Sequence, residues 1–124
     1  MVLVDGQPMN ACLMMAYQCE GRSIVTIEGL SGCELSPATD CHTAEPNAAG
    51  LHPIQRAIVA EGGLQCGYCT PGVVISLAGL YKQTGSPTRE QIEEALSGNL
   101  CRCTGYEGII RAALRATSHP DPTP

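Results

Sequence analysis

The stretches of sequence that decide the fold are QCGYCTP at residues 65–71 and CRCTGY at residues 101–106. They place four thiols as a C-x2-C pair and a C-x-C pair, each directly before a stretch with helical character. Two such pairs can meet at one site, because thiolates bind zinc and iron–sulfur clusters in sets of four. Metal binding is therefore the first function that the sequence predicts.

Four short helices are predicted from residue 51 onward. Leu51, Ile54 and Ile58 recur at helical spacing before a stop at Gly62 and Gly63. The second helix is predicted to start with Thr70 as its N-cap and Pro71 at its first position. The third helix is predicted to start at the capping box of Thr88 and Gln91, with Ile92, Ala95 and Leu96 facing inward. The fourth is predicted to start around Tyr106 and to include Ile109, Ile110, Ala113 and Leu114.

These placements predict a compact helical bundle over residues 51–117, with a tail at 118–124. The second helix is apolar on nearly every face from Val73 to Tyr81, so we expect it to be the buried one. The thiols then lie at two helix N-termini, whose partial positive charge favours thiolates. Gly67 and Gly105 have no side chain, and we expect the backbone to approach sulfur closely there.

The N-terminal part is predicted to be the end of an α+β unit, over residues 1–30. It contains an apolar run with a turn at Asp5 and Gly6, a helix candidate at Ala11–Tyr17 and a strand candidate at Ser23–Ile27. Residues 31–50 are rich in Ser, Thr, Pro, Asn and Gly and are predicted to be a loop.

Composition and charge argue against some classes of function. The 124 residues carry a net charge of −5 and no run of basic residues, which argues against a nucleic-acid partner and favours a protein one. No apolar run has the length of a membrane span, and the start of the sequence lacks the features of a signal peptide, so we expect a cytoplasmic protein. In that compartment the eight cysteines are expected to be ligands or reactive thiols. Spacing alone leaves zinc and iron–sulfur binding equally open.

Three stretches resemble a known family: LHPIQRA at residues 51–57, QCGYCTPG at 65–72 and ALSGNLCRCTGY at 95–106. They are similar to the iron–sulfur subunit of molybdenum hydroxylases, the group of xanthine dehydrogenase, aldehyde oxidoreductase and carbon monoxide dehydrogenase. The resemblance implies a mainly α chain, in which a four-helix 2Fe-2S-binding bundle follows a truncated α+β remnant of a β-grasp, ferredoxin-like domain.

The resemblance also implies the ligands. Matched residue by residue, Cys66, Cys69, Cys101 and Cys103 correspond to the ligands of the bundle cluster. Gln65 and Cys103 correspond to the positions beside the molybdopterin of a large partner subunit. An intact family member holds two 2Fe-2S clusters, and one is expected here.

The implied function is electron transfer within a molybdopterin-dependent hydroxylase or dehydrogenase complex. Electrons would pass from the molybdenum centre through this chain to an FAD-binding medium subunit or another acceptor. We expect no catalytic acid, base or nucleophile on the chain, because the cofactors perform the chemistry. The alternative is a zinc-stabilised four-cysteine module for protein interaction.

The chain departs from the family pattern at two places. A three-cysteine loop of the C-x4-C-x2-C type is expected before the first strand and is absent, so Cys12, which corresponds to the fourth ligand of the distal cluster, lacks its companions. A late start, a truncation or ligands from another chain would each explain this. A missing N-terminal segment is the favoured explanation, because Val2–Val4 would otherwise be a strand with an unpaired edge. In the chain as given, Cys12 is expected to be a small buried residue.

The second departure is an extended loop that carries Cys33, Cys41 and His42, which we expect to be a surface loop that touches a partner. Four good ligands are not identifiable there, so a third metal site is not predicted. His52, which precedes Pro53, is expected to hydrogen-bond at a helix start and not to bind metal.

Overall fold

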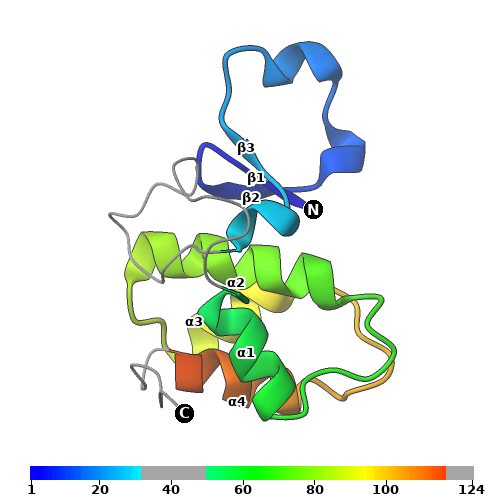
Figure 1. Cartoon of the computed structure of the whole chain (residues 1–124), viewed down its shortest axis with the longest axis vertical. Helices are drawn as coiled ribbons and strands as arrows, with labels where there is room; N and C mark the ends of the chain where they lie inside the picture. Colours follow the sequence, from blue (N-terminus) through cyan, green and yellow to red (C-terminus); the bar gives the residue numbers. More distant parts are fainter. Residues whose placement is uncertain (32–49, 117–124) are drawn as a thin grey trace.

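A computed structural model describes residues 1–31 and 50–116 of the chain. A small antiparallel sheet with three short 3-10 turns lies on one side of four helices (Figure 1). The predicted loop with Cys33, Cys41 and His42 and the tail at 118–124 lie outside the described residues. The mainly helical architecture with a small sheet confirms the predicted fold class.

The sheet has the strand order β2-β1-β3, with β1 at Val2–Val4, β2 at Gln7–Met9 and β3 at Ile24–Val25. Val4 pairs with Gln7, so the hairpin turns at Asp5 and Gly6, both of which have positive φ. This is the two-residue turn that an Asp-Gly pair favours. The prediction that β1 has an unpaired edge is wrong, because β1 is the central strand and pairs on both sides.

The prediction of a helix at Ala11–Tyr17 is also wrong. Two 3-10 turns replace it, η1 at Ala11–Leu13 and η2 at Ala16–Cys19, and none of their residues is buried. Cys12 is exposed and is therefore not the small buried residue that we expected. Most of the stability of a short helix in a protein comes from burying an apolar face, and η1 and η2 bury none of their residues.

Helix α1 runs from Pro53 to Ala60, and His52 is its N-cap residue. The Nδ1 atom of His52 accepts a hydrogen bond from the Ile54 N–H at 3.3 Å, which confirms the expected role of His52 at the helix start. Ile54 and Ile58 are buried, whereas Leu51 precedes the helix and is half exposed.

Helix α2, at Thr70–Thr84, is the buried helix that the sequence predicts: all its side chains from Val73 to Tyr81 are buried except Leu80. Its N-cap is Cys69 and not Thr70, so Thr70 is the first helical residue and Pro71 the second. The helix lies between the sheet and the remaining helices (Figure 1).

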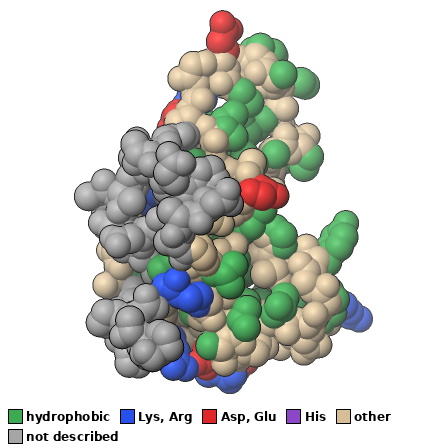
Figure 2. Space-filling view, viewed as in Figure 1, with side chains coloured by type: hydrophobic (Ala, Val, Ile, Leu, Met, Phe, Trp, Pro, Cys, Tyr) green, Lys and Arg blue, Asp and Glu red, His purple; other side chains and the backbone are tan. Residues whose placement is uncertain are grey.

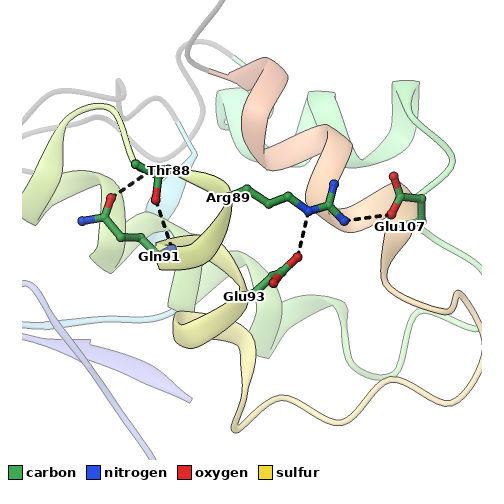
Figure 3. Close-up of polar contacts among 5 residues, drawn as sticks. All are labelled: Thr88, Arg89, Gln91, Glu93 and Glu107. Atoms are coloured by element: carbon green, nitrogen blue, oxygen red, sulfur yellow. Dashed lines mark hydrogen bonds and ion pairs between the residues drawn. The ribbon is translucent and has the colours of Figure 1, made fainter.

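Helices α3 (Arg89–Leu96) and α4 (Glu107–Ala116) complete the bundle. Thr88 and Gln91 form the predicted capping box, and the guanidinium of Arg89 bridges Glu93 on α3 and Glu107 on α4 (Figure 3). Helix α4 crosses α1 closely, because a Cβ at Gly108 would lie 3.0 Å from the carbonyl oxygen of Gly62.

One hydrophobic core joins the sheet to the helices. Leu3 and Val25 from the sheet belong to the same cluster of buried residues as Ile58, Leu77 and Ile109 from the bundle. The sheet is thus packed on α2 and shares the interior of the helical part, which fixes the orientation of the loops at the helix ends.

Candidate metal centre

The two cysteine loops lie side by side at one end of the bundle (Figure 1). The first loop leads from α1 into α2, and Cys69 is the last residue before that helix. The second leads from α3 into α4, so the short connections between consecutive helices bring residues more than thirty positions apart together. The structure therefore gathers the four predicted ligands at one place.

The four thiols form two pairs, each with one cysteine from each loop. The thiols of Cys66 and Cys103 lie close enough to change each other's pKa, and so do those of Cys69 and Cys101. The pair of Cys69 and Cys101 is the inner one, because Cys101 is only 7% exposed, whereas Cys66 and Cys103 are exposed. Among the described residues, no three or more Cys, His, Asp or Glu side chains are gathered into a site for a single metal ion.

The pairs differ in which thiol ionises more readily. A hydrogen bond from the Thr104 hydroxyl, with help from the backbone N–H of Thr104, lowers the pKa of Cys101 to about 7. Burial raises the pKa of Cys69. In this inner pair Cys101 therefore ionises more readily than Cys69.

In the outer pair the backbone N–H of Tyr68, followed by the thiol of Cys103, lowers the pKa of Cys66. The hydrogen bond with Cys66 raises the pKa of Cys103. In each pair one thiol thus ionises more readily than the other, and metal binding would release the remaining protons, since metal ligands must be deprotonated.

The two glycines beside the cysteines have a special backbone conformation. Gly67 and Gly105 both have positive φ, at 82° and 66°. A Cβ at Gly67 would make only ordinary contact at 3.7 Å, and one at Gly105 would meet nothing within 4 Å. The positive φ at both positions is a backbone conformation that favours glycine.

Hydrogen bonds of Tyr106 close the second cysteine loop, and this role of Tyr106 was not predicted from the sequence. The Tyr106 hydroxyl donates to the Asn99 carbonyl at 2.9 Å and accepts from the Cys101 N–H at 2.7 Å. Thr104 Oγ1 lies 3.0 Å from Cys101 Sγ. The run Thr104-Gly105-Tyr106 directly after the cysteines was the available signal, but the positive φ of Tyr106 has no sequence signature.

The other two predicted site residues, Gln65 and Cys12, lie in different parts of the molecule. Gln65 is exposed beside Cys66, at the same end of the bundle as the exposed Cys103. Cys12 lies on η1, next to the sheet, and takes no part in the paired group.

Large apolar side chains are exposed around the cysteines as well as on the N-terminal turns. Tyr68 is 94% exposed and Leu100 84% exposed, one in each cysteine loop. Figure 2 shows further hydrophobic side chains on the surface at the N-terminal end, where Leu13 and Tyr17 are exposed. Exposed apolar groups of this size mark protein–protein contact surfaces when they lie together.

Comparisons with known proteins agree with this arrangement. A family model described as the 2Fe-2S binding domain matches residues 26–114. The chain is 49% identical over 114 residues to a probable xanthine dehydrogenase subunit of Bacillus subtilis, covering 92% of this chain and 57% of that protein. It is 44% identical over 115 residues to the nicotine 6-hydroxylase small subunit of Paenarthrobacter nicotinovorans, covering 93% of this chain and 60% of that protein.

Solved structures give the same result. Quinoline 2-oxidoreductase from Pseudomonas putida 86 matches with a TM-score of 0.76 at 38% identity, over 94% of this chain and 64% of that one. Aldehyde oxidoreductase from Desulfovibrio gigas matches with a TM-score of 0.76 at 34% identity, over 94% of this chain and 12% of that one. The chain thus spans less than two thirds of the length of each of these proteins.

Proposed function

The chain belongs to the 2Fe-2S binding domain family, and from that premise we propose that it transfers electrons as the iron–sulfur subunit of a molybdopterin-dependent hydroxylase or dehydrogenase complex. Two of its relatives are named as subunits, one of a xanthine dehydrogenase and one of a nicotine 6-hydroxylase. In this proposal electrons pass from the molybdenum centre of a large partner subunit towards FAD on a medium subunit or another acceptor. The proposal includes the predicted cytoplasmic location, and among the described residues no helix is long and apolar enough to cross a membrane.

The observation that carries the proposal is the pairing of the four thiols. A 2Fe-2S cluster takes four cysteine thiolates, two on each iron. The two cross-loop pairs fit that demand, and we assign Cys66 and Cys103 to one iron and Cys69 and Cys101 to the other. When bound, the cluster supplies a centre that takes up and releases one electron at a time.

The residues of this chain give the cluster an inner and an outer side. Cys69 and Cys101 hold the side next to the core, where burial keeps water away. Cys66 and Cys103 hold the side at the surface. An exposed ligand shortens the path to a redox group on another chain, and we therefore place the molybdopterin subunit against Gln65 and Cys103.

The exposed apolar residues extend this proposed contact surface. Leu64, Tyr68 and Leu100 flank the cysteines on the two loops, and all three are exposed in this chain. Burying them against the large subunit would remove water from the outer side of the cluster. Interfaces of this kind have an apolar, aromatic centre.

The domain division of the sequence analysis is part of the proposal, with residues 51–117 as the cluster-binding part. Cys12 can contribute to a second, distal cluster only together with three thiolates from elsewhere, since such a cluster needs four ligands.

The test is metal analysis of the chain purified together with the subunits that accompany it. We expect two irons and two acid-labile sulfides for the bundle site, and an electron paramagnetic resonance signal that appears on reduction. Equimolar zinc without labile sulfide would overturn the proposal and favour the zinc-stabilised interaction module. A molybdopterin-containing subunit in the purified complex would support the assignment of the partner.

A further inference from the structure

The loop from Asn99 to Tyr106 is closed by one side chain that returns to the loop's own beginning. The Tyr106 hydroxyl accepts the Cys101 N–H at 2.7 Å and donates to the Asn99 carbonyl at 2.9 Å. The Asn99 side chain is buried and donates to Ser76 on α2 at 2.7 Å. The loop that carries two thiols is thus anchored to the central helix through Tyr106 and Asn99.

Tyr106 adopts a backbone conformation that ordinary residues avoid. Its φ is 67°, in the left-handed region, which is unfavourable for a residue with a Cβ. Such a conformation persists where the surrounding contacts hold it, and here the two bonds of the hydroxyl do so. The conformation brings the Tyr106 N–H to within 3.2 Å of Thr104 Oγ1.

Thr104 Oγ1 lies between the Tyr106 N–H and the Cys101 thiol. Its Oγ1 accepts from the Tyr106 N–H and lies 3.0 Å from Cys101 Sγ. Either Oγ1 or Sγ could supply the proton of this contact while Cys101 is a thiol. A cysteine that binds metal is a thiolate without a proton, so the hydroxyl must then be the donor.

We propose that Thr104 is a positioning residue that raises the reduction potential of the cluster by donating an O–H···S hydrogen bond to Cys101, and that Tyr106 holds Thr104 in place for this role. The inference rests on the proposed function. Reduction adds a negative charge to the cluster and its sulfur ligands, and a hydrogen-bond donor stabilises the form with more negative charge. Hydrogen bonds to sulfur are among the groups that set such potentials.

The test is a redox titration of the full chain, purified with its accompanying subunits, and followed by electron paramagnetic resonance. Thr104→Val keeps the shape of the side chain and removes the donor. We expect the ratio of reduced to oxidised cluster at a fixed ambient potential to fall about tenfold, which is about 59 mV for a one-electron couple. Thr104→Ser keeps the donor and should stay close to the unmodified chain.

Thr84→Val is the matched control. Thr84 is exposed at the end of α2 and donates to the Leu80 carbonyl, away from the cysteines. We expect no change of potential from it. A loaded Thr104→Val chain with an unchanged potential, or an equal shift in Thr84→Val, would overturn the inference. A Thr104→Val chain that holds no cluster would also overturn it, because Thr104 would then act on assembly; partial loading does not interfere, since the potential is read on the loaded fraction.

Tyr106→Phe tests the second half of the inference. It keeps the aromatic ring and removes the hydroxyl that ties Cys101 to Asn99. If Tyr106 acts through Thr104, the potential falls in the same direction, and the double variant with Thr104→Val shifts no further than Thr104→Val alone. Additive shifts would overturn the positioning role of Tyr106. An unmodified chain without iron and sulfide would instead refute the proposed function, so the two failures are distinguishable.

Discussion

The described residues contain two groups of cysteines in opposite surroundings. Cys12 and Cys19 lie on short, unburied 3-10 turns beside the sheet. The four cysteines of the bundle lie in the two loops that lead into α2 and α4, and each lies close enough to a cysteine of the other loop to affect its pKa. A cysteine is thus a candidate ligand because helices bring two loops together and not because it is exposed, since Cys66 and Cys103 are exposed and so is Cys12.

The largest expected difference between the two groups is in metal content. Cys101→Ser should abolish the cluster, because three thiolates and a hydroxyl do not complete the ligand set of two irons. Iron and labile sulfide per chain should fall close to zero, and electron flow through a complex should stop with them. Iron analysis and electron paramagnetic resonance of the reduced chain provide the measurement.

Cys12→Ser is the matched control for that experiment. It makes the same atomic change on η1, and we expect the signal of the bundle cluster to keep its full intensity. Equal loss in both variants would remove the distinction between the two groups and with it the assignment of the four ligands.

The helical part of this comparison was predictable from sequence because its signals are local. Pro53 and Pro71 lie in the first turns of α1 and α2, and Thr88 and Gln91 form the capping box of α3. Each signal involves a side chain and a backbone group within about one turn of helix, so no tertiary contact is needed to recognise it. The same locality explains why the positions of the four cysteines could be placed before two helices.

The rest depended on contacts between distant residues. The pairing of β1 with both β2 and β3 and the exposure of Ala11–Tyr17 follow from what packs on α2, which no short window of sequence contains. Thr70 has the better side chain for an N-cap, yet the backbone of the loop makes Cys69 the N-cap residue. Which cysteines pair, and the left-handed backbone of Tyr106, likewise emerge only when both loops are in place.

The helical bundle and the sheet region should also differ in how they make the free energy of unfolding depend on pH. Burial lowers the pKa of His52 to about 4, with smaller contributions from the positive charges of Arg56 and Lys82. Because the folded pKa lies below the unfolded one, the unfolded state binds more protons between pH 6.5 and 4. Stability should therefore be complete above pH 6.5 and fall by about 3 kcal/mol as the pH approaches 4.

His52→Asn isolates this effect, since Asn can cap the helix but does not titrate. Its denaturant midpoint should change less between pH 7 and pH 4.5 than that of the unmodified chain. In the sheet region, the Arg22–Asp5 ion pair is exposed at both side chains, and Arg22→Gln should leave the pH dependence almost unchanged. A steeper pH dependence in His52→Asn would show that His52 is not a buried neutral cap.

The junction of the two regions is tested at Gly79. A Cβ at this position of α2 would lie 2.6 Å from Cδ of Pro8 in β2 and 3.3 Å from Cδ2 of Leu3 in β1. Gly79→Ala should therefore push the sheet away from the helix and cost about 1–2 kcal/mol in the free energy of unfolding, even though alanine favours the helix.

Gly98→Ala serves as the comparison, because a Cβ there meets nothing within 4 Å and Gly98 does not have positive φ. We expect a change of less than about 0.5 kcal/mol from it. If Gly79→Ala raised stability by its helix propensity alone, the sheet would be loosely attached and the two regions would not share one core.

The smallest expected difference concerns the hydrogen bonds at the ends of short elements. Thr88 accepts the Gln91 N–H at the start of α3, while in the N-terminal turn Gln18 accepts the Met15 N–H at 2.8 Å (Figure 3 shows the former). Thr88→Ala should cost about 1 kcal/mol, because α3 carries Ile92 and Leu96 into the core and its unfolding would expose them. Gln18→Ala should cost less than about 0.5 kcal/mol, because η2 buries no side chain and can open without loss of packing. Urea unfolding of both variants measures the difference, and a larger loss from Gln18→Ala would mean that the N-terminal turns contribute to the fold as strongly as the bundle does.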